Sequence, residues 1–180
     1  MAVQGARPAL SLNQPAPGVY VYDFGQNLTG WAAIHLHAPR GARLRIRYAE
    51  SPNADGNLNV ENLRFARATD TYVFNGNSDL EEWQPRFTYH GFRYAEVSIP
   101  AAPHTPPHHD SVTAVLVHSK LTPAASFTSS NALFNQIHTV ALWTLRSNLM
   151  SNPTDGAQRD ERMGWLAYAH LASAASMMHF

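Results

Sequence analysis

Residues 43–50 alternate between charged and apolar side chains, and this period of two restricts the local fold more tightly than any other pattern in the chain. The residues in order are Arg43, Leu44, Arg45, Ile46, Arg47, Tyr48, Ala49 and Glu50. Successive side chains of a β-strand point to opposite faces, so one face of this segment is apolar and the other is charged. The pattern predicts a strand that buries one face against a hydrophobic core.

Similar short runs precede and follow this strand, at residues 19–24, 31–37, 69–75, 82–88, 94–99 and 112–118. Turn-forming residues such as Pro39 and Gly41 separate neighbouring runs, and strands at this spacing are typical of a two-sheet antiparallel sandwich. We therefore predict a mainly β fold, with a β-sandwich over residues 18–120. Residues 1–17 are small, polar and proline-bearing, and we expect them to form a strap or a disordered lead-in.

The pattern becomes helical after residue 120. Between residues 131 and 150, apolar residues recur at steps of three and four: Leu133, Phe134, Ile137, Ala141 and Leu145. Ser129 or Ser130 can cap this helix, and Pro153 ends it. A second helix is expected from about Gln158 to the end of the chain. The apolar stripe of the first helix has no partner within the sequence, so we expect it to promote self-association or local disorder.

The charge balance argues against highly charged partners. Acidic and basic residues number 13 each, so no strong field attracts nucleic acid or an anionic membrane surface. The sequence has no apolar run long enough to span a membrane and no signal-peptide core at its start. The absence of cysteine favours a reducing, cytoplasmic compartment without deciding it. A neutral ligand such as a sugar fits this composition.

A proline-rich stretch at residues 101–110 contains three histidines: His104, His108 and His109. Metal ligands usually converge from fixed elements with supporting hydrogen bonds, whereas this stretch has the composition of a flexible loop. We therefore predict neither a metal site nor a cofactor. The aromatic run at residues 87–94 could offer a sugar-binding face, but strands more often use such residues to fill a sandwich core.

Residues 152–165 concentrate the charge of an otherwise weakly charged chain: Asp155, Arg159, Asp160, Glu161 and Arg162 precede Trp165. One interpretation is a solvated helix start with an acidic cap and paired arginines. The other is a site that cleaves sugars, because glycoside hydrolysis uses one carboxylic acid as a proton donor and a second carboxylate. On a helix starting near Gln158, Glu161 and Trp165 would share a face.

The motif resembles the catalytic signature of the bacterial α-L-rhamnosidases of glycoside hydrolase family seventy-eight. Three earlier blocks are similar to the same family in the same order, at residues 22–31, 61–70 and 85–94. The resemblance covers roughly residues 19 to 166, and several blocks in register are more specific than one. It implies that a concanavalin-like sandwich is followed by the start of a barrel of six α-hairpins, over residues 121–180.

The resemblance also implies the roles of single residues. Glu161 would be the general acid, Asp155 and Arg159 would bind rhamnose hydroxyls, and Trp165 would form a wall of the subsite. The family acts with inversion and takes its general base from a glutamate far downstream, which this sequence does not include. Tyr168 stands where the family usually has a further aspartate that contacts the sugar, and Gly156-Ala157 replaces Cys-Pro.

These observations give two alternative functions. The first is a fragment of an α-L-rhamnosidase that acts on rhamnose-containing glycosides and is inactive alone. The second is a non-catalytic carbohydrate-binding or structural sandwich module whose helical tail docks elsewhere.

Overall fold

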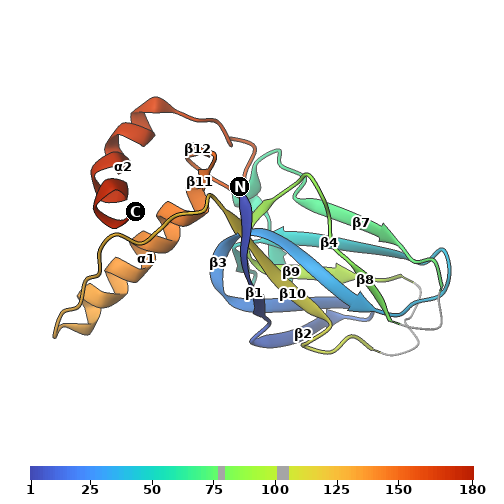
Figure 1. Ribbon diagram of the computed structural model, residues 1–180. Coiled ribbons are helices and arrows are strands. Elements are labelled where there is room, and N and C mark those ends of the chain that lie inside the picture. Colours follow the sequence, from blue (N-terminus) through green and yellow to red (C-terminus); the bar gives the residue numbers. More distant parts are fainter. Residues whose placement is uncertain (77–79, 101–105) are drawn as a thin grey trace.

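A computed structural model describes residues 1–76, 80–100 and 106–180 of the chain. A β-sandwich lies on one side of the molecule and two helices lie on the other (Figure 1). The strands are β1 Ala2–Pro8, β2 Ser11–Ala16, β3 Val19–Leu36, β4 Arg43–Ala49, β5 Ser51–Pro52, β6 Leu58–Asn59, β7 Thr69–Val73, β8 Glu81–Trp83, β9 His90–Ser98, β10 Val112–His118, β11 Leu149–Met150 and β12 Asn152–Pro153. The helices are η1 Glu61–Leu63, α1 Ala132–Asn148 and α2 Leu166–His179.

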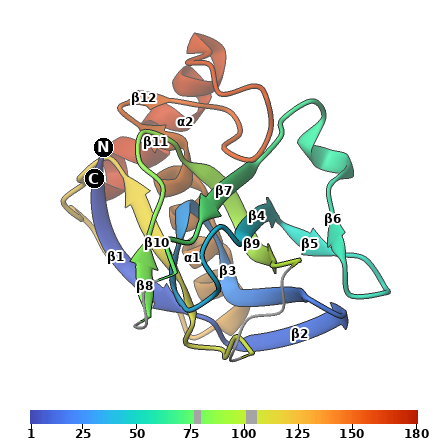
Figure 2. The same cartoon turned by 90° about the vertical axis from the view of Figure 1, so that its right-hand side faces the viewer.

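Eight strands form the main antiparallel sheet, in the order β1-β10-β3-β9-β4-β7, with β2 and β8 also paired to β3. The N-terminal part of β3 pairs with β2 and β9, and its C-terminal part pairs with β10 and β8. The register with β9 shifts between Asp23 and Leu28, where Gly25 adopts a positive φ of 70°. One long strand therefore pairs with four other strands of the same sheet. Figure 2 shows the sandwich from the side of the molecule away from the helices.

The alternation along β4 is confirmed. Leu44, Ile46 and Tyr48 are completely buried, whereas Arg43 and Arg45 are exposed. The apolar face of β4 belongs to a large core. The other fully buried members of this core include Tyr22, Phe24, Leu28, Phe74, Phe92, Val97 and Ile99. Burial of this aliphatic and aromatic surface is the main force that stabilises the sandwich, since the chain has no disulfide bond.

The structure corrects several boundaries. Residues 1–17, predicted to form a strap or a disordered lead-in, are ordered and form β1, which pairs with β10, and β2, which pairs with β3. Hydrogen bonding to the sheet edges orders a segment whose own sequence has little periodicity. The runs at 19–24 and 31–37 form one strand of 18 residues. The strand predicted at 82–88 ends at Trp83, and Phe87 is fully exposed with a φ of 61°.

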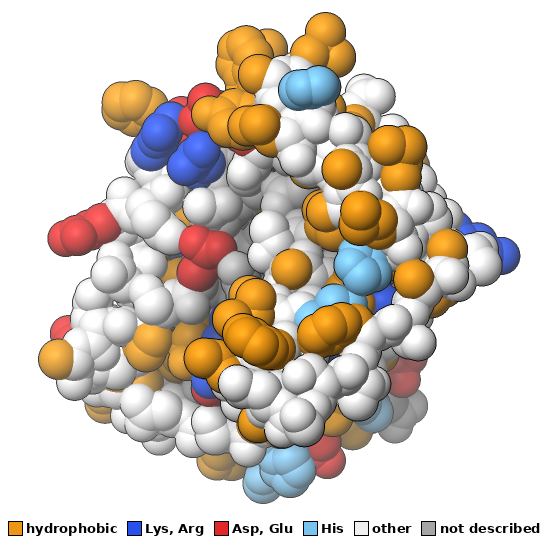
Figure 3. All heavy atoms as spheres, turned by 90° about the vertical axis from the view of Figure 1, so that its left-hand side faces the viewer, with side chains coloured by type: hydrophobic (Ala, Val, Ile, Leu, Met, Phe, Trp, Pro, Cys, Tyr) orange, Lys and Arg blue, Asp and Glu red, His pale blue; other side chains and the backbone are white. Residues whose placement is uncertain are grey.

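The first predicted helix is confirmed within a few residues, but its cap is Asn131 and neither Ser129 nor Ser130. The Asn131 side chain accepts a hydrogen bond from the backbone N–H of Leu133. Leu133, Ile137 and Val140 on this helix are more than half exposed. The space-filling view of the helical side shows hydrophobic side chains distributed over this surface (Figure 3). In the described parts of the chain, neither α1 nor α2 is long and apolar enough to cross a membrane.

Candidate functional site

The charged motif lies in an extended coil that connects the β11–β12 hairpin to α2. The helix predicted from Gln158 begins instead at Leu166, so that the argument placing Glu161 and Trp165 on one helical face was wrong. Contacts with the sandwich, described next, hold the backbone of this coil in a non-helical path, and tertiary contacts of this kind override weak local helix propensity. The motif therefore depends on the sandwich for its shape.

The N-terminal end of β9 and the residue before it, Tyr89, support the motif at two points. Gly91 donates its backbone N–H to the carbonyl of Ala157 at 3.2 Å. Arg162 donates from Nη1 to the carbonyl of Tyr89 at 2.6 Å, and its guanidinium lies 4.4 Å from the centre of the Tyr89 ring. Burial lowers the pKa of Arg162, against the effect of its contacts with Tyr89. Arg162 thus anchors the motif to the residue that precedes β9.

Gly91 is required by the close approach of two backbones. A Cβ atom at this position would lie 2.7 Å from the backbone nitrogen of Gln158 and 2.8 Å from the carbonyl carbon of Ala157. Ala157 itself is buried against the sandwich. A glycine is therefore needed here for packing, whatever its backbone angles.

Three of the four predicted site residues form a chain of ion pairs. Arg159 Nη2 lies 3.2 Å from Asp155 Oδ2, and Arg159 Nε lies 3.2 Å from Glu161 Oε2. The Asp155 side chain is 3% exposed, and its second oxygen, Oδ1, has no hydrogen-bond partner among the described residues. A buried carboxylate oxygen without a partner is costly, and a ligand that donates a hydrogen bond would satisfy it.

Glu161 also contacts a residue that the sequence did not identify as part of the site. Arg64, which follows η1 in the sandwich, places Nη1 2.7 Å from Glu161 Oε2. The Glu161 side chain is 29% exposed and the Arg64 side chain is 53% exposed, so solvent weakens this pair. Trp165 stands at the N-terminal end of α2 and is 42% exposed.

A cavity of about 330 Å³ lies between the sandwich and α1, next to residues 155–158 of the motif. Its polar lining includes Asn27 and Glu50 from the sandwich and Thr144 from α1, together with the buried Asp155. Glu50 accepts one hydrogen bond from Asn27 and one from Asn62, each at 2.6 Å. The two asparagines are distant in the sequence, and their convergence on Glu50 depends on the tertiary fold.

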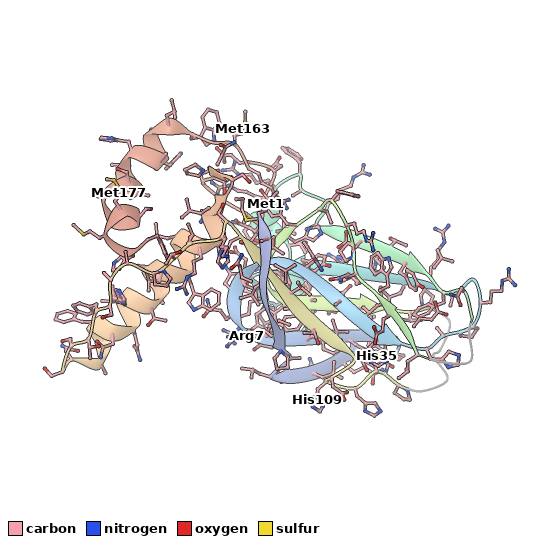
Figure 4. All side chains as sticks on the ribbon, viewed as in Figure 1. Met1, Arg7, His35, His109, Met163 and Met177 are labelled. Carbon is pink, nitrogen blue, oxygen red and sulfur yellow. The ribbon has the colours of Figure 1, made fainter. Side chains whose placement is uncertain are left out.

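A second cavity, of about 690 Å³, lies between α1 and α2. Asp155 lines it together with Tyr168 and several apolar residues of α2, including Leu171 and Met177. Asp155 thus borders both hollows. In the side-chain view, Met177 and Met163 lie on the helical side of the molecule, and His109 lies at the bottom of the sandwich (Figure 4).

Neither His108 nor His109 lines either of these cavities. His108 and His109 are exposed, and His104 lies outside the described residues. Within the described ranges, no three histidine, aspartate or glutamate side chains are grouped closely enough to hold a metal ion.

Comparison with known proteins assigns both parts of the chain. Residues 13–118 match the family model of the bacterial alpha-L-rhamnosidase concanavalin-like domain, and residues 122–180 match that of the bacterial alpha-L-rhamnosidase 6 hairpin glycosidase domain. An alpha-L-rhamnosidase of Streptomyces avermitilis is 41% identical over 159 residues, which are 88% of this chain and 15% of that protein. One of Formosa agariphila is 38% identical over 88% of this chain and 17% of its own length.

Solved structures agree with these matches. The structure of alpha-L-rhamnosidase from Dictyoglumus thermophilum superposes with a TM-score of 0.94 at 42% identity, over 99% of this chain and 20% of that one. The crystal structure of the Streptomyces avermitilis enzyme complexed with L-rhamnose gives a TM-score of 0.92 at 36% identity, over 98% of this chain and 17% of the other. This chain therefore spans a fifth or less of the length of each of these relatives. It belongs to the bacterial α-L-rhamnosidases of glycoside hydrolase family seventy-eight.

Proposed function

We propose that this chain carries the acid side of an α-L-rhamnosidase site, which cleaves terminal α-L-rhamnose from glycosides with inversion. The observation that carries the proposal is the ion-paired chain of Asp155, Arg159 and Glu161, at the positions where the family motif places its sugar-binding and acid residues. The relatives at 41% and 38% identity are alpha-L-rhamnosidases, and one similar structure was solved with L-rhamnose.

The proposed chemistry assigns one task to each residue. Glu161 gives its proton to the glycosidic oxygen as the bond to the anomeric carbon breaks, so that the leaving group departs as an alcohol. Asp155 accepts hydrogen bonds from sugar hydroxyls through Oδ1, which has no partner in the described part of the chain, and Arg159 holds both carboxyls in place. Trp165 provides an apolar face on which the sugar ring can stack.

Inversion also needs a water molecule activated by a second carboxylate on the opposite side of the sugar. The family takes that base from a glutamate far downstream, at a position outside these 180 residues. We therefore expect the 180-residue polypeptide to bind rhamnose without hydrolysing rhamnosides.

Calorimetry with L-rhamnose, followed in parallel by tryptophan fluorescence, tests this proposal. Binding should be weakened by Asp155→Asn and by Trp165→Ala, whereas Glu82→Gln, which changes an exposed side chain on β8, should leave it unchanged. Incubation with an aryl α-L-rhamnoside should release no rhamnose. If the purified polypeptide released rhamnose, and the Glu161→Gln variant did not, the predicted need for a general base outside these residues would be contradicted.

A non-catalytic sugar-binding module is the second candidate, and the cavity beside the sandwich favours it. Its lining by amide and carboxylate side chains, with Trp143 alongside, is typical of sites for polyhydroxy ligands. In that case Glu50→Gln would abolish sugar binding and Glu161→Gln would not change it.

A further inference from the structure

The two recorded contacts of the Glu161 carboxyl group fall on the same oxygen. Oε2 lies 2.7 Å from Arg64 Nη1 and 3.2 Å from Arg159 Nε. Within the described residues, Oε1 makes no recorded hydrogen bond or ion pair. The two oxygens of a carboxylic acid are chemically equivalent until their surroundings distinguish them. Here two guanidinium groups make this distinction.

Arg64 reaches the motif from a well-anchored loop of the sandwich. The loop begins at η1, where Leu63 is buried, and Asn62 donates a hydrogen bond to Glu50 Oε2 at 2.6 Å. Arg64 follows with φ 55° and ψ −115°, a backbone conformation that residues other than glycine rarely adopt. Such a conformation persists where the surrounding structure imposes it, and it directs the Arg64 side chain to Glu161.

The second contact, from Arg159, does not make Arg64 redundant. Arg159 belongs to the same coil as Glu161, and it also pairs with Asp155. It therefore links two members of the motif but cannot fix their position relative to the sandwich. Arg64 fixes the position of Glu161 relative to the sandwich, because Arg64 belongs to the sandwich whereas Asp155 and Arg159 belong to the motif.

We propose that Arg64 is a positioning residue for Glu161, which holds Oε2 and leaves Oε1 as the oxygen that carries the transferable proton. This inference rests on the proposed function. The Oε1–H bond breaks and the proton passes to the glycosidic oxygen, which also takes the electron pair of its broken bond to the anomeric carbon. Water attacks that carbon and loses its proton to a separate carboxylate base. Glu161 becomes negatively charged, and the guanidinium at Oε2 stabilises that charge.

Side-chain NMR of the isotope-labelled 180-residue chain tests the contact without relying on activity. A guanidinium held by a short charge-assisted hydrogen bond rotates slowly about its Cζ–N bonds, and its Nη resonances are then resolved at low temperature. We expect resolved Arg64 resonances in the wild type and averaged ones in Glu161→Gln. Glu61→Gln, on the same loop, should leave them resolved.

Binding of methyl α-L-rhamnoside then tests the consequence for the sugar. Arg64→Ala should weaken binding by about twofold to fivefold, a range that reflects the solvent exposure of the pair. Arg64→Lys keeps the charge but lacks the planar fork, and it should recover part of this loss. Arg67→Ala removes an exposed arginine from the same loop and should bind like the wild type. Melting temperatures should be similar for all of these variants.

Each result decides one part of the inference. Identical Arg64 resonances in the wild type and Glu161→Gln would overturn it, whatever the sugar measurements show. Unchanged affinity in Arg64→Ala, with the contact present in the NMR spectra, would also overturn it. Absence of rhamnoside binding in the wild type would instead refute the proposed function of this chain, and with it the catalytic meaning of the Arg64–Glu161 contact.

Discussion

Replacing Gly91 by alanine should displace the motif from the sandwich. The added Cβ would lie 2.7 Å from Gln158 N, 2.8 Å from the Ala157 carbonyl carbon and 3.0 Å from Ala157 Cβ. Carbon atoms pack best at about 3.5–4.0 Å, so the coil must retreat by roughly 0.5–1 Å. Two of the three clashing atoms belong to the backbone, which cannot move aside by changing a rotamer. The hydrogen bond from Gly91 N to Ala157 O, already 3.2 Å, would lengthen further.

The expected cost follows from these distances. Overpacking of a close contact costs about 1–3 kcal/mol, and the weakened hydrogen bond adds about 1 kcal/mol. Replacing a strand glycine recovers about 0.5–1 kcal/mol of chain entropy. The net destabilisation is then about 1–3 kcal/mol, or roughly 2–12 °C in the melting temperature of a chain of this size.

Thermal unfolding combined with hydrogen exchange measures this effect. Gly91→Ala should lower the melting temperature and increase exchange at residues 155–162, while the strands of the core stay protected. Gly5→Ala is the matched control, because a Cβ there meets no atom within 4 Å. If Gly91→Ala has the stability of Gly5→Ala and leaves exchange of the motif unchanged, the backbone contact does not hold the motif in place.

Three further outcomes are expected. Hydrogen bonds from Arg93 hold the pKa of Asp23 below its usual range, so the pair stabilises the fold at neutral pH and this contribution is lost as the pH falls through that lowered pKa. Asp23→Asn should therefore lower the free energy of unfolding in urea by about 1 kcal/mol at pH 7. The difference in this free energy between variant and wild type should become smaller below about pH 4. Ile137→Lys, on the exposed face of α1, should reduce self-association in sedimentation experiments. Tyr168→Asp should strengthen L-rhamnose binding several-fold in calorimetry, and unchanged affinity would count against a sugar contact there.

Local patterns predicted the elements that depend on local chemistry. The alternation along β4 and the apolar spacing of α1 each identify one face of one element, and both segments form as predicted. The apolar residues of α1 are exposed as expected, whereas the self-association inferred from them stays a prediction. The strands at residues 1–17 were not predicted, because β1 and β2 form by pairing with β10 and β3. The periodicity of residues 1–17 does not reveal these pairings.

The site shows the same division. The resemblance of residues 152–165 to a family motif identified Asp155, Arg159 and Glu161, which the structure brings together. Their roles in binding and catalysis, and that of Trp165, stay predictions. The helix expected from Gln158 does not form, because contacts of residues 157 and 162 with β9 fix an extended path. Arg64 was part of a block used for the resemblance, but its 97-residue separation from Glu161 concealed their contact.

The docking of the motif on β9 also limits how such proteins can diversify. Although residues 13–118 and 122–180 match separate family models, Gly91 and Tyr89 shape a coil that belongs to the second region. A recombination event that joined this helical region to a different sandwich would preserve the sequence of the motif but not its conformation. The conformation would be kept if the new sandwich also had a glycine and an accepting carbonyl at the positions of Gly91 and Tyr89. Natural exchange between relatives should therefore transfer the two regions together, as a single inherited unit.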